Sequence, residues 1–252
     1  MPQPPDRAKS YTLIQQSQGR SQAVKAQERR QRNDMDFAAA RKHMVDSQVR
    51  PNDVTDIDLQ LAMESLPREK FVPSNRKSLA YAELGIELFP GRWLLQARDF
   101  SKLIHAAGIR KGDLVLDVGC GYGYSSAVIA RLAGMVVALE EDEAIAGDAE
   151  KRIAALGIDN AVTVDGPLTD GMTNQGPYDV ITIANGGIAE RPVKLLDQLK
   201  TGGRLVAIWV NGGIGRATVY TKSAEAIGDR FVFEAQPPGI LPGFKPAPAF
   251  TF

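Results

Sequence analysis

The amino-acid sequence predicts an α/β fold in which a doubly wound, mostly parallel sheet of seven strands follows an N-terminal helical cap. From residue 99 to residue 210, short apolar segments alternate with helical patterns at the spacing of βαβ units. The apolar segments are nearly continuous, as expected for strands that are buried on both faces of a sheet. The segment 114–118 also runs directly into a glycine-rich turn and a helical pattern, the junction at which α/β sheets bind nucleotides.

The chain is expected to divide into four segments. Residues 1–34 are rich in Gln, Ser, Arg and Lys and poor in large apolar side chains, so they bury too little surface to offset their ordering entropy. They are expected to be a disordered or partly helical extension, and Met35 could itself be a start residue. The other expected segments are the N-terminal cap with the substrate side (35–97), the main sheet domain (98–236) and a Pro-rich C-terminal strap (237–252).

The expected elements are placed by their periodicity and their end signals. In the cap, residues 37–49 are expected to form one helix, and Thr55 is expected to cap a second. Residues 81–96 lack a clear period, and Pro90-Gly91 marks a turn within them. The sheet domain is expected to contain helices at 99–107, 125–133, 143–156 and 189–199, parallel strands at 114–118, 135–139, 161–164, 180–184 and 205–210, and a closing antiparallel pair at 217–221 and 231–235.

Composition excludes several classes of protein. Thirty Lys and Arg residues balance thirty Asp and Glu residues, so no overall positive field favours a nucleic-acid partner. The single cysteine, Cys120, excludes an internal disulfide, and with only two histidines no metal site is expected. No apolar run approaches the roughly 18 residues of a membrane span, and no signal-peptide core follows Met1. The sequence therefore favours a cytoplasmic protein without a membrane anchor.

The glycine turn indicates which nucleotide the sheet binds. Dinucleotide folds use Gly-x-Gly-x-x-Gly, in which the third glycine allows the helix to pack closely on the strand. Gly119 and Gly121 fit that pattern, but the third position is Tyr124. The run from Asp117 to Gly123 instead reads Asp-x-Gly-x-Gly-x-Gly, which resembles the first motif of the class I S-adenosylmethionine-dependent methyltransferases. A purely structural glycine turn in another α/β protein is the alternative.

This resemblance implies a Rossmann-like methyltransferase domain at 98–236 with S-adenosyl-L-methionine as its cofactor. Because that ligand has no phosphate and carries a zwitterionic methionine tail, a carboxylate at Asp117 beside glycine backbone suits it. Cys120 is interpreted as a small packing residue, since nothing near it in the sequence would lower its pKa. The expected cofactor-binding residues are Asp117, Gly119, Cys120, Gly121, Tyr122, Gly123, Glu140, Glu141, Asp165 and Gly166.

Acidic residues close the second and third predicted strands. Glu140 follows the turn by about twenty residues, the distance at which nucleotide-binding folds place a carboxylate on the ribose hydroxyls. Glu141 belongs to the expected site, although it and the next two acidic residues also suit a helix N-terminus. Asp165 could accept a hydrogen bond from the adenine amino group while Gly166 lets the chain turn, and a simple turn aspartate is the alternative.

The fourth predicted strand ends at Asn185-Gly186-Gly187. In many methyltransferases this corner faces the methyl group, so Asn185 is a candidate catalytic residue. An adenine or glutamine N-methyltransferase would carry a motif such as Asn-Pro-Pro-Tyr there, and this chain does not.

The N-terminal half narrows the resemblance to one family. Residues 44–50 read Met-Val-Asp-Ser-Gln-Val-Arg, and residues 67–73 read Pro-Arg-Glu-Lys-Phe-Val-Pro. Together with Ala62-Met63 and Tyr81-Ala82 they resemble the N-terminal signature of the protein-L-isoaspartate O-methyltransferases. The stretches 177–179 and 202–206 agree with that family, so the resemblance covers roughly residues 36–210.

The acceptor motif departs from that family. The resemblance leads us to expect Thr-Ile-Ser-x-Pro, whose hydroxyls help to hold the isoaspartyl substrate, but residues 93–97 read Trp-Leu-Leu-Gln-Ala. Leu95 takes the serine position, and leaving an anionic oxygen without that donor would cost about 1–3 kcal/mol. Gln96 is retained, and Arg92 or Arg98 are candidate replacement donors.

Three functions are compatible with these residues. The leading one is methyl transfer from S-adenosylmethionine to a carboxylate of a protein or peptide, as in isoaspartyl protein repair. It requires no general base because a carboxylate is ionised at neutral pH, which leaves positioning as the main task. The second is methylation of a more apolar small molecule or a different peptide, which Trp93, Leu94 and Leu95 would suit. The third is a non-catalytic scaffold that binds the same cofactor.

Overall fold

The structure, a computed structural model, describes residues 37–245. The chain divides into two units, Met1–Ala40 and Arg41–Phe252, and the fold below is that of the second. The expected extension at 1–34 and residues 246–252 of the expected strap lie outside the described residues.

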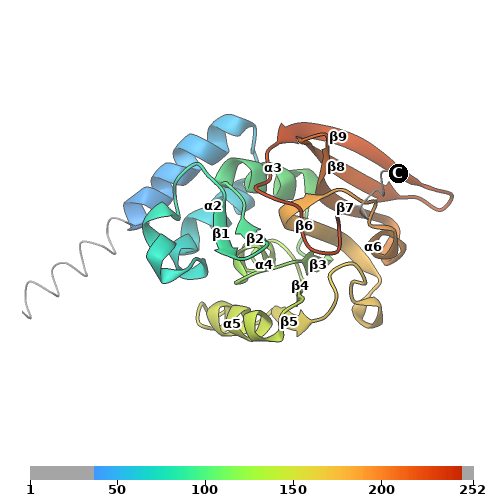
Figure 1. The fold of residues 1–252 in the computed structure, drawn as a ribbon, viewed down its shortest axis with the longest axis horizontal. Coiled ribbons are helices and arrows are strands. Elements are labelled where there is room, and N and C mark those ends of the chain that lie inside the picture. Colours follow the sequence, from blue (N-terminus) through green and yellow to red (C-terminus); the bar gives the residue numbers. More distant parts are fainter. Residues whose placement is uncertain (1–36, 246–252) are drawn as a thin grey trace, which may run out of the picture. The chain divides into compact units, whose positions relative to one another are not determined.

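A seven-stranded sheet forms the centre of the described part of the second unit (Figure 1). Its spatial order is β5-β4-β3-β6-β7-β8-β9; the first five strands are parallel, and β8 and β9 run antiparallel. The predicted doubly wound sheet is thus confirmed. The strands are β3 (Leu114–Val118), β4 (Met135–Glu140), β5 (Ala161–Asp165), β6 (Tyr178–Ile188), β7 (Leu199–Asn211), β8 (Ile214–Lys222) and β9 (Ile227–Ala235).

Both faces of the central strands are buried. Because successive strand side chains point to opposite faces, Val115 belongs to one core cluster and Leu116 to the other. Val136 and Val137 divide between the two clusters in the same way. This two-sided burial explains why these strands are nearly continuous apolar runs in the sequence.

Helices cover the sheet on both sides, and their ends differ slightly from expectation. The helix predicted at 189–199 is shorter because β6 continues to Ile188 and β7 already begins at Leu199. Asp56, rather than Thr55, caps the second cap helix, since its Oδ1 accepts a hydrogen bond from the Leu59 amide at 3.1 Å. The helices are α2 (Ile57–Ser65), α3 (Ala97–Ala107), α4 (Tyr124–Ala130), α5 (Glu143–Ala154) and α6 (Val193–Asp197), with short helical turns η1 (Val45–Val49), η2 (Arg50–Asn52), η3 (Arg68–Phe71), η4 (Ser74–Leu79) and η5 (Thr173–Gln175).

The segment without a clear period contains a small hairpin. Strands β1 (Ile86–Phe89) and β2 (Arg92–Leu94) pair antiparallel around the expected Pro90-Gly91 turn. Gly91 has φ of 80°, a conformation that side-chain-bearing residues rarely adopt. The two strands are too short for alternation to show in the sequence, so the hairpin was not predicted.

A buried arginine ties this hairpin to the cap. Arg68 is completely buried, and its guanidinium donates to the backbone oxygens of Ala80 and Leu95. The guanidinium also lies 4.8 Å from the centre of the Tyr124 ring in α4. The connector, the end of β2 and α4 are therefore held together by one side chain.

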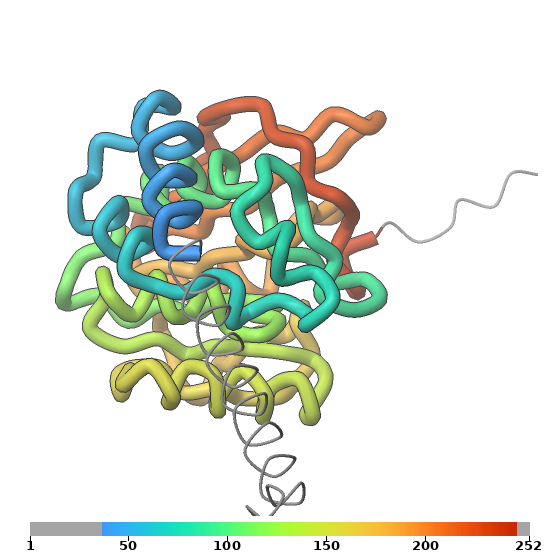
Figure 2. Tube along the Cα trace, turned by 90° about the vertical axis from the view of Figure 1, so that its left-hand side faces the viewer, coloured from blue at the N-terminus to red at the C-terminus, as the bar shows by residue number. Residues whose placement is uncertain are grey.

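The C-terminal segment 236–244 crosses the end of β6. The Gly187 amide donates to Gly239 O at 2.8 Å, and the Leu241 amide donates to Gly187 O at 2.9 Å. The Trp93 ring of the hairpin lies against Gly239, and Figure 2 shows the two segments side by side. Leu241 and Phe244 are buried in the same core cluster as β6. We refer to residues 236–244 as the strap.

We predict that Leu241→Ala destabilises the fold, because the Leu241 side chain is completely buried and alanine would leave a cavity. The free energy of unfolding should fall by about 2–5 kcal/mol in a urea titration. The control is Val193→Ala, at an exposed position in α6, which should change it by no more than about 0.5 kcal/mol. Equal effects of the two substitutions would show that the strap does not stabilise the sheet.

Candidate functional site

The carboxyl ends of β3, β4 and β6 meet at the glycine turn. Gly119, Gly121 and Gly123 all have positive φ, at 72°, 56° and 90°, which explains the repeated glycines of the motif. The amides of Gly119 and Cys120 donate to Leu139 O at 2.8 and 3.0 Å. The turn is therefore fixed against the last residues of β4.

Asp117 fixes the turn from below. Its carboxylate is completely buried and accepts hydrogen bonds from the hydroxyls of Ser125 and Ser126, both at 2.6 Å, and from Thr182 at 2.9 Å. Burial raises the pKa of this carboxyl, while the three hydroxyl donors act in the opposite direction. These contacts support a role in joining β3 to α4 and β6.

Asn185 reaches the turn from an irregularity in β6. Regular pairing between β6 and β7 breaks between Ile183 and Gly187, which displaces Asn185 from the ladder. Its amide nitrogen donates to Gly119 O at 3.0 Å and to the Ser125 hydroxyl at 2.9 Å. Among the described residues no donor reaches its buried Oδ1, so this oxygen is free to accept a hydrogen bond from a ligand.

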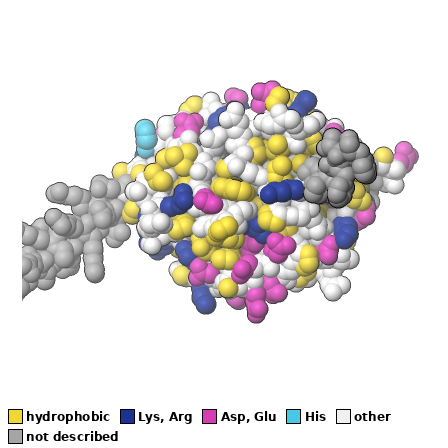
Figure 3. Space-filling view, in the orientation of Figure 1, with side chains coloured by type: hydrophobic (Ala, Val, Ile, Leu, Met, Phe, Trp, Pro, Cys, Tyr) yellow, Lys and Arg dark blue, Asp and Glu magenta, His cyan; other side chains and the backbone are white. Residues whose placement is uncertain are grey.

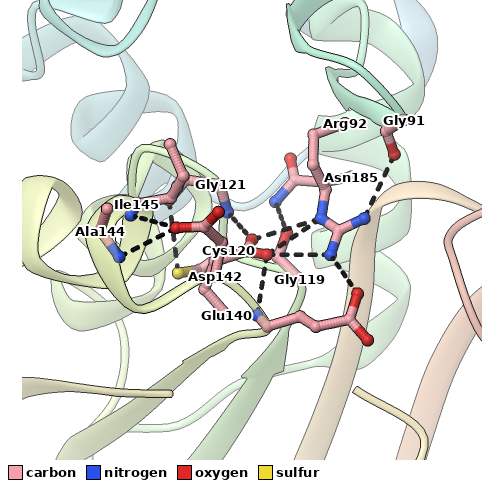
Figure 4. A network of polar contacts seen from close by, with 11 residues as sticks. Gly91, Arg92, Gly119, Cys120, Gly121, Glu140, Asp142, Ala144, Ile145 and Asn185 are labelled. Carbon is pink, nitrogen blue, oxygen red and sulfur yellow. Dashed lines mark hydrogen bonds and ion pairs between the residues drawn. The ribbon is translucent and has the colours of Figure 1, made fainter. Parts of the chain in front are cut away.

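Glu140 is the buried acid at the end of β4, and the chain's own groups surround its carboxylate (Figure 4). Arg92 of β2 donates to Oε1 from Nη2 at 2.9 Å and from Nε at 3.1 Å. The amides of Gly121 and Glu141 donate to Oε2 and Oε1, both at 2.9 Å. The sequence placed Glu140 at the ribose but contained no local signal for its pairing with Arg92, which lies 48 residues earlier.

The remaining predicted acids lie along the same edge of the sheet. Glu141 is 48% exposed and lies 3.3 Å from Arg92 Nη2. Asp165 is exposed at the end of β5, in register with Glu140, and the Gly166 amide donates to Glu140 O. Asp142 caps α5 through the amides of Ala144 and Ile145, so the acidic run serves the helix N-terminus as well.

Two further turn residues make packing contacts. Cys120 is buried with Ala138 and Ala149, and burial raises the pKa of its thiol well above the usual value. The Tyr122 ring lies 5.5 Å from the Phe89 ring and 4.4 Å from the Arg152 guanidinium. These contacts link the turn to the β1–β2 hairpin and to α5.

Leucine side chains cover the glycines, a feature that the sequence did not reveal. A Cβ added at Gly121 would lie 2.8 Å from Leu88 Cδ1, and one added at Gly186 would lie 2.8 Å from Leu241 Cγ. A Cβ at Gly119 would lie 3.4 Å from Leu241 Cδ1. The close approach that glycine permits is thus made here by the hairpin and the strap. A ligand that contacts the turn must displace these side chains.

The predicted acceptor segment is buried beside the site. Leu95 is 1% exposed and belongs to the apolar core. The Gln96 side-chain amide donates to Asp99 Oδ2 at 2.8 Å. Arg98 donates to the other oxygen of the buried Asp99 at 2.6 Å. Gln96 and Arg98 are therefore already paired, and Arg92 is the third candidate donor of this segment.

The polar groups around the turn fit S-adenosylmethionine. Glu140 would hold the ribose, the glycine backbone would pass close to the ligand, and Asn185 Oδ1 would accept a hydrogen bond from the ammonium group of the methionine tail. The described residues contain no group of three His, Cys, Asp or Glu side chains that could hold a metal. Within residues 37–245, no helix combines the length and the apolar character needed to cross a membrane.

Relatives with this sequence pattern share one name. Residues 39–230 match the family model of protein-L-isoaspartate(D-aspartate) O-methyltransferase. Protein-L-isoaspartate O-methyltransferase 1 of Rhodopseudomonas palustris (strain HaA2) is 38% identical over 170 residues, which cover 68% of this chain and 69% of that protein. The enzyme of the same name from Methanoculleus marisnigri is 35% identical over 167 residues, which cover 66% of this chain and 76% of that protein.

Solved structures agree on the fold. A protein-L-isoaspartate O-methyltransferase matches with a TM-score of 0.69 at 24% identity, covering 81% of this chain and 66% of that one. A Plasmodium falciparum protein described as a β-aspartate methyltransferase, in complex with S-adenosyl-L-homocysteine, matches with a TM-score of 0.67 at 19% identity, covering 79% and 97%. The predicted fold and family are confirmed. This chain belongs to the protein-L-isoaspartate O-methyltransferases, a family of S-adenosylmethionine-dependent enzymes.

Proposed function

We propose that this chain transfers a methyl group from S-adenosylmethionine to the carboxylate of an isoaspartyl residue in a protein or peptide. The observation that supports this most directly is the buried set of polar groups at the turn. Glu140, the positive-φ glycines and the unpartnered Asn185 Oδ1 lie together at the ends of β3, β4 and β6 in a chain of this family.

The chemistry asks little of the protein beyond positioning. The bound cofactor supplies an electrophilic methyl group on a sulfonium. Since the acceptor carboxylate is ionised at neutral pH, no side chain has to remove a proton from it. Glu140 and Asn185 would orient the donor, while Leu88 and Leu241 keep water from the turn. Alignment of the two reactants and exclusion of water then provide the rate enhancement.

The second candidate, a more apolar acceptor, is favoured by one observation. The serine position of the family motif is the buried Leu95, which offers no hydrogen bond to an anionic oxygen. The third candidate, a cofactor-binding scaffold, predicts binding of S-adenosylhomocysteine without methylation of any acceptor.

We predict that incubation with labelled S-adenosylmethionine and an isoaspartyl peptide yields a base-labile methyl ester. The same peptide with an ordinary aspartyl linkage should yield none. The label is measured as volatile methanol released after mild alkali. If neither peptide is labelled while an acceptor in a cell lysate is, the second candidate replaces the first.

We predict that Leu95→Ser raises kcat/KM for the isoaspartyl peptide by roughly 10–100-fold, because a hydroxyl donor worth about 1–3 kcal/mol is restored. The melting temperature should fall, because Leu95 is a core residue. The matched control is Leu94→Ser, which removes an equally buried leucine from the neighbouring position without restoring the motif. An equal loss of activity in both variants would contradict the expected role of position 95.

A further inference from the structure

The carboxylate of Glu140 has no remaining acceptor capacity. A carboxylate offers about four lone-pair sites. Described residues already direct four N–H groups at it: Arg92 Nε and Nη2, and the backbone amides of Gly121 and Glu141. All four donor distances lie between 2.9 and 3.1 Å. A ribose hydroxyl that binds Glu140 must therefore replace one of these donors.

Only the arginine can be replaced without remodelling the sheet. The Gly121 amide is fixed by the glycine turn, and the Glu141 amide follows Glu140 directly in the chain. Arg92 instead reaches Glu140 through a flexible side chain that is 4% exposed. Pairing of Glu140 with Arg92 and pairing of Glu140 with a ribose are thus mutually exclusive.

We propose that Arg92 determines acceptor specificity: the nucleoside of the cofactor displaces it from Glu140, and the freed guanidinium binds the carboxylate of the methyl acceptor. This rests on the proposed function, because an isoaspartyl acceptor is an anion. The guanidinium suits the task, since its fork of N–H donors matches a carboxylate in a bidentate geometry. A buried cation also cannot remain unpaired without a large cost in free energy.

The position of Arg92 is right for both partners. It begins β2, directly before the segment 93–97 in which the family holds its acceptor. Glu141, half-exposed and 3.3 Å from Arg92 Nη2, provides a pivot at the rim when the guanidinium leaves Glu140. Figure 3 shows acidic side chains gathered over the α5 and β5 region of this face. An anionic acceptor arriving there needs a cation to face it.

Other cations of the neighbourhood are engaged elsewhere. Arg98 donates to the buried Asp99, which keeps a carboxylate partner whatever binds at the turn. Arg76 pairs with Glu87 of β1, and both of these side chains are about half-exposed. Arg92 differs because its partner is the same carboxylate that the cofactor requires.

The first test is calorimetric titration with S-adenosylhomocysteine, which reports binding without turnover. We expect Arg92→Gln to bind this ligand about tenfold more tightly than the unmodified chain, because no ion pair has to be broken. Arg92→Lys should fall between the two, since lysine makes a weaker, monodentate pair. The control, Arg76→Gln, removes an arginine from the same neighbourhood and should leave the affinity unchanged. Melting curves establish that each variant is folded. Equal affinity in all four proteins overturns the displacement of Arg92.

The second test measures the affinity of the isoaspartyl peptide with and without saturating S-adenosylhomocysteine. In the unmodified chain the ligand should tighten peptide binding at least tenfold, and Arg92→Gln should abolish that gain. Arg92→Lys should retain part of it. A gain of equal size in Arg92→Gln overturns the acceptor role.

The two proposals fail in different ways. If the unmodified chain forms no methyl ester but the peptide binds in the ligand-dependent, Arg92-dependent manner above, the catalytic proposal fails and the Arg92 proposal stands. If the ester forms and Arg92→Gln changes neither affinity, the reverse holds.

Discussion

The rest of the site depends on one buried carboxylate, Glu140. A buried carboxylate without partners would cost several kcal/mol, so the fold must supply donors from whatever segments it can bring close. It does so from the glycine turn, from the start of the α5 connection and from the β1–β2 hairpin. The hairpin is thereby fastened to the carboxyl edge of the sheet by charge as well as by apolar packing. The same charge determines what a nucleoside must displace.

A second buried carboxylate lies one strand away and is satisfied in a different manner. Asp117 receives three hydroxyl hydrogen bonds and no cation, and burial raises its pKa. Nothing about this arrangement has to change when a ligand arrives, because Ser125, Ser126 and Thr182 belong to α4 and β6. Asp117 thus preserves the shape of the turn, whereas Glu140 exchanges partners. Both are motif acids in the sequence, and only their surroundings separate these roles.

The sequence predicted what depends on local pattern. Strand burial produced continuous apolar runs, and the glycine spacing and the acid at the end of β4 followed from backbone geometry and strand order. The sequence did not predict β1 and β2, which have four and three residues and show no measurable alternation. Nor did it predict that Leu241 lies on Gly119 or that Arg92 pairs with Glu140, because no local pattern reports contacts between residues so distant in the chain.

The coverings of the turn constrain how tightly a cofactor can bind. A ligand shifts an arrangement only by the difference in free energy with which it binds the two forms. Part of the cofactor's binding free energy is therefore consumed in moving Arg92 and the Leu88 and Leu241 side chains. That expenditure is not lost if it creates a site for the acceptor, because binding energy realised away from the reacting atoms can then support their alignment. Donor and acceptor binding become coupled through one side chain, with the donor favoured to bind first.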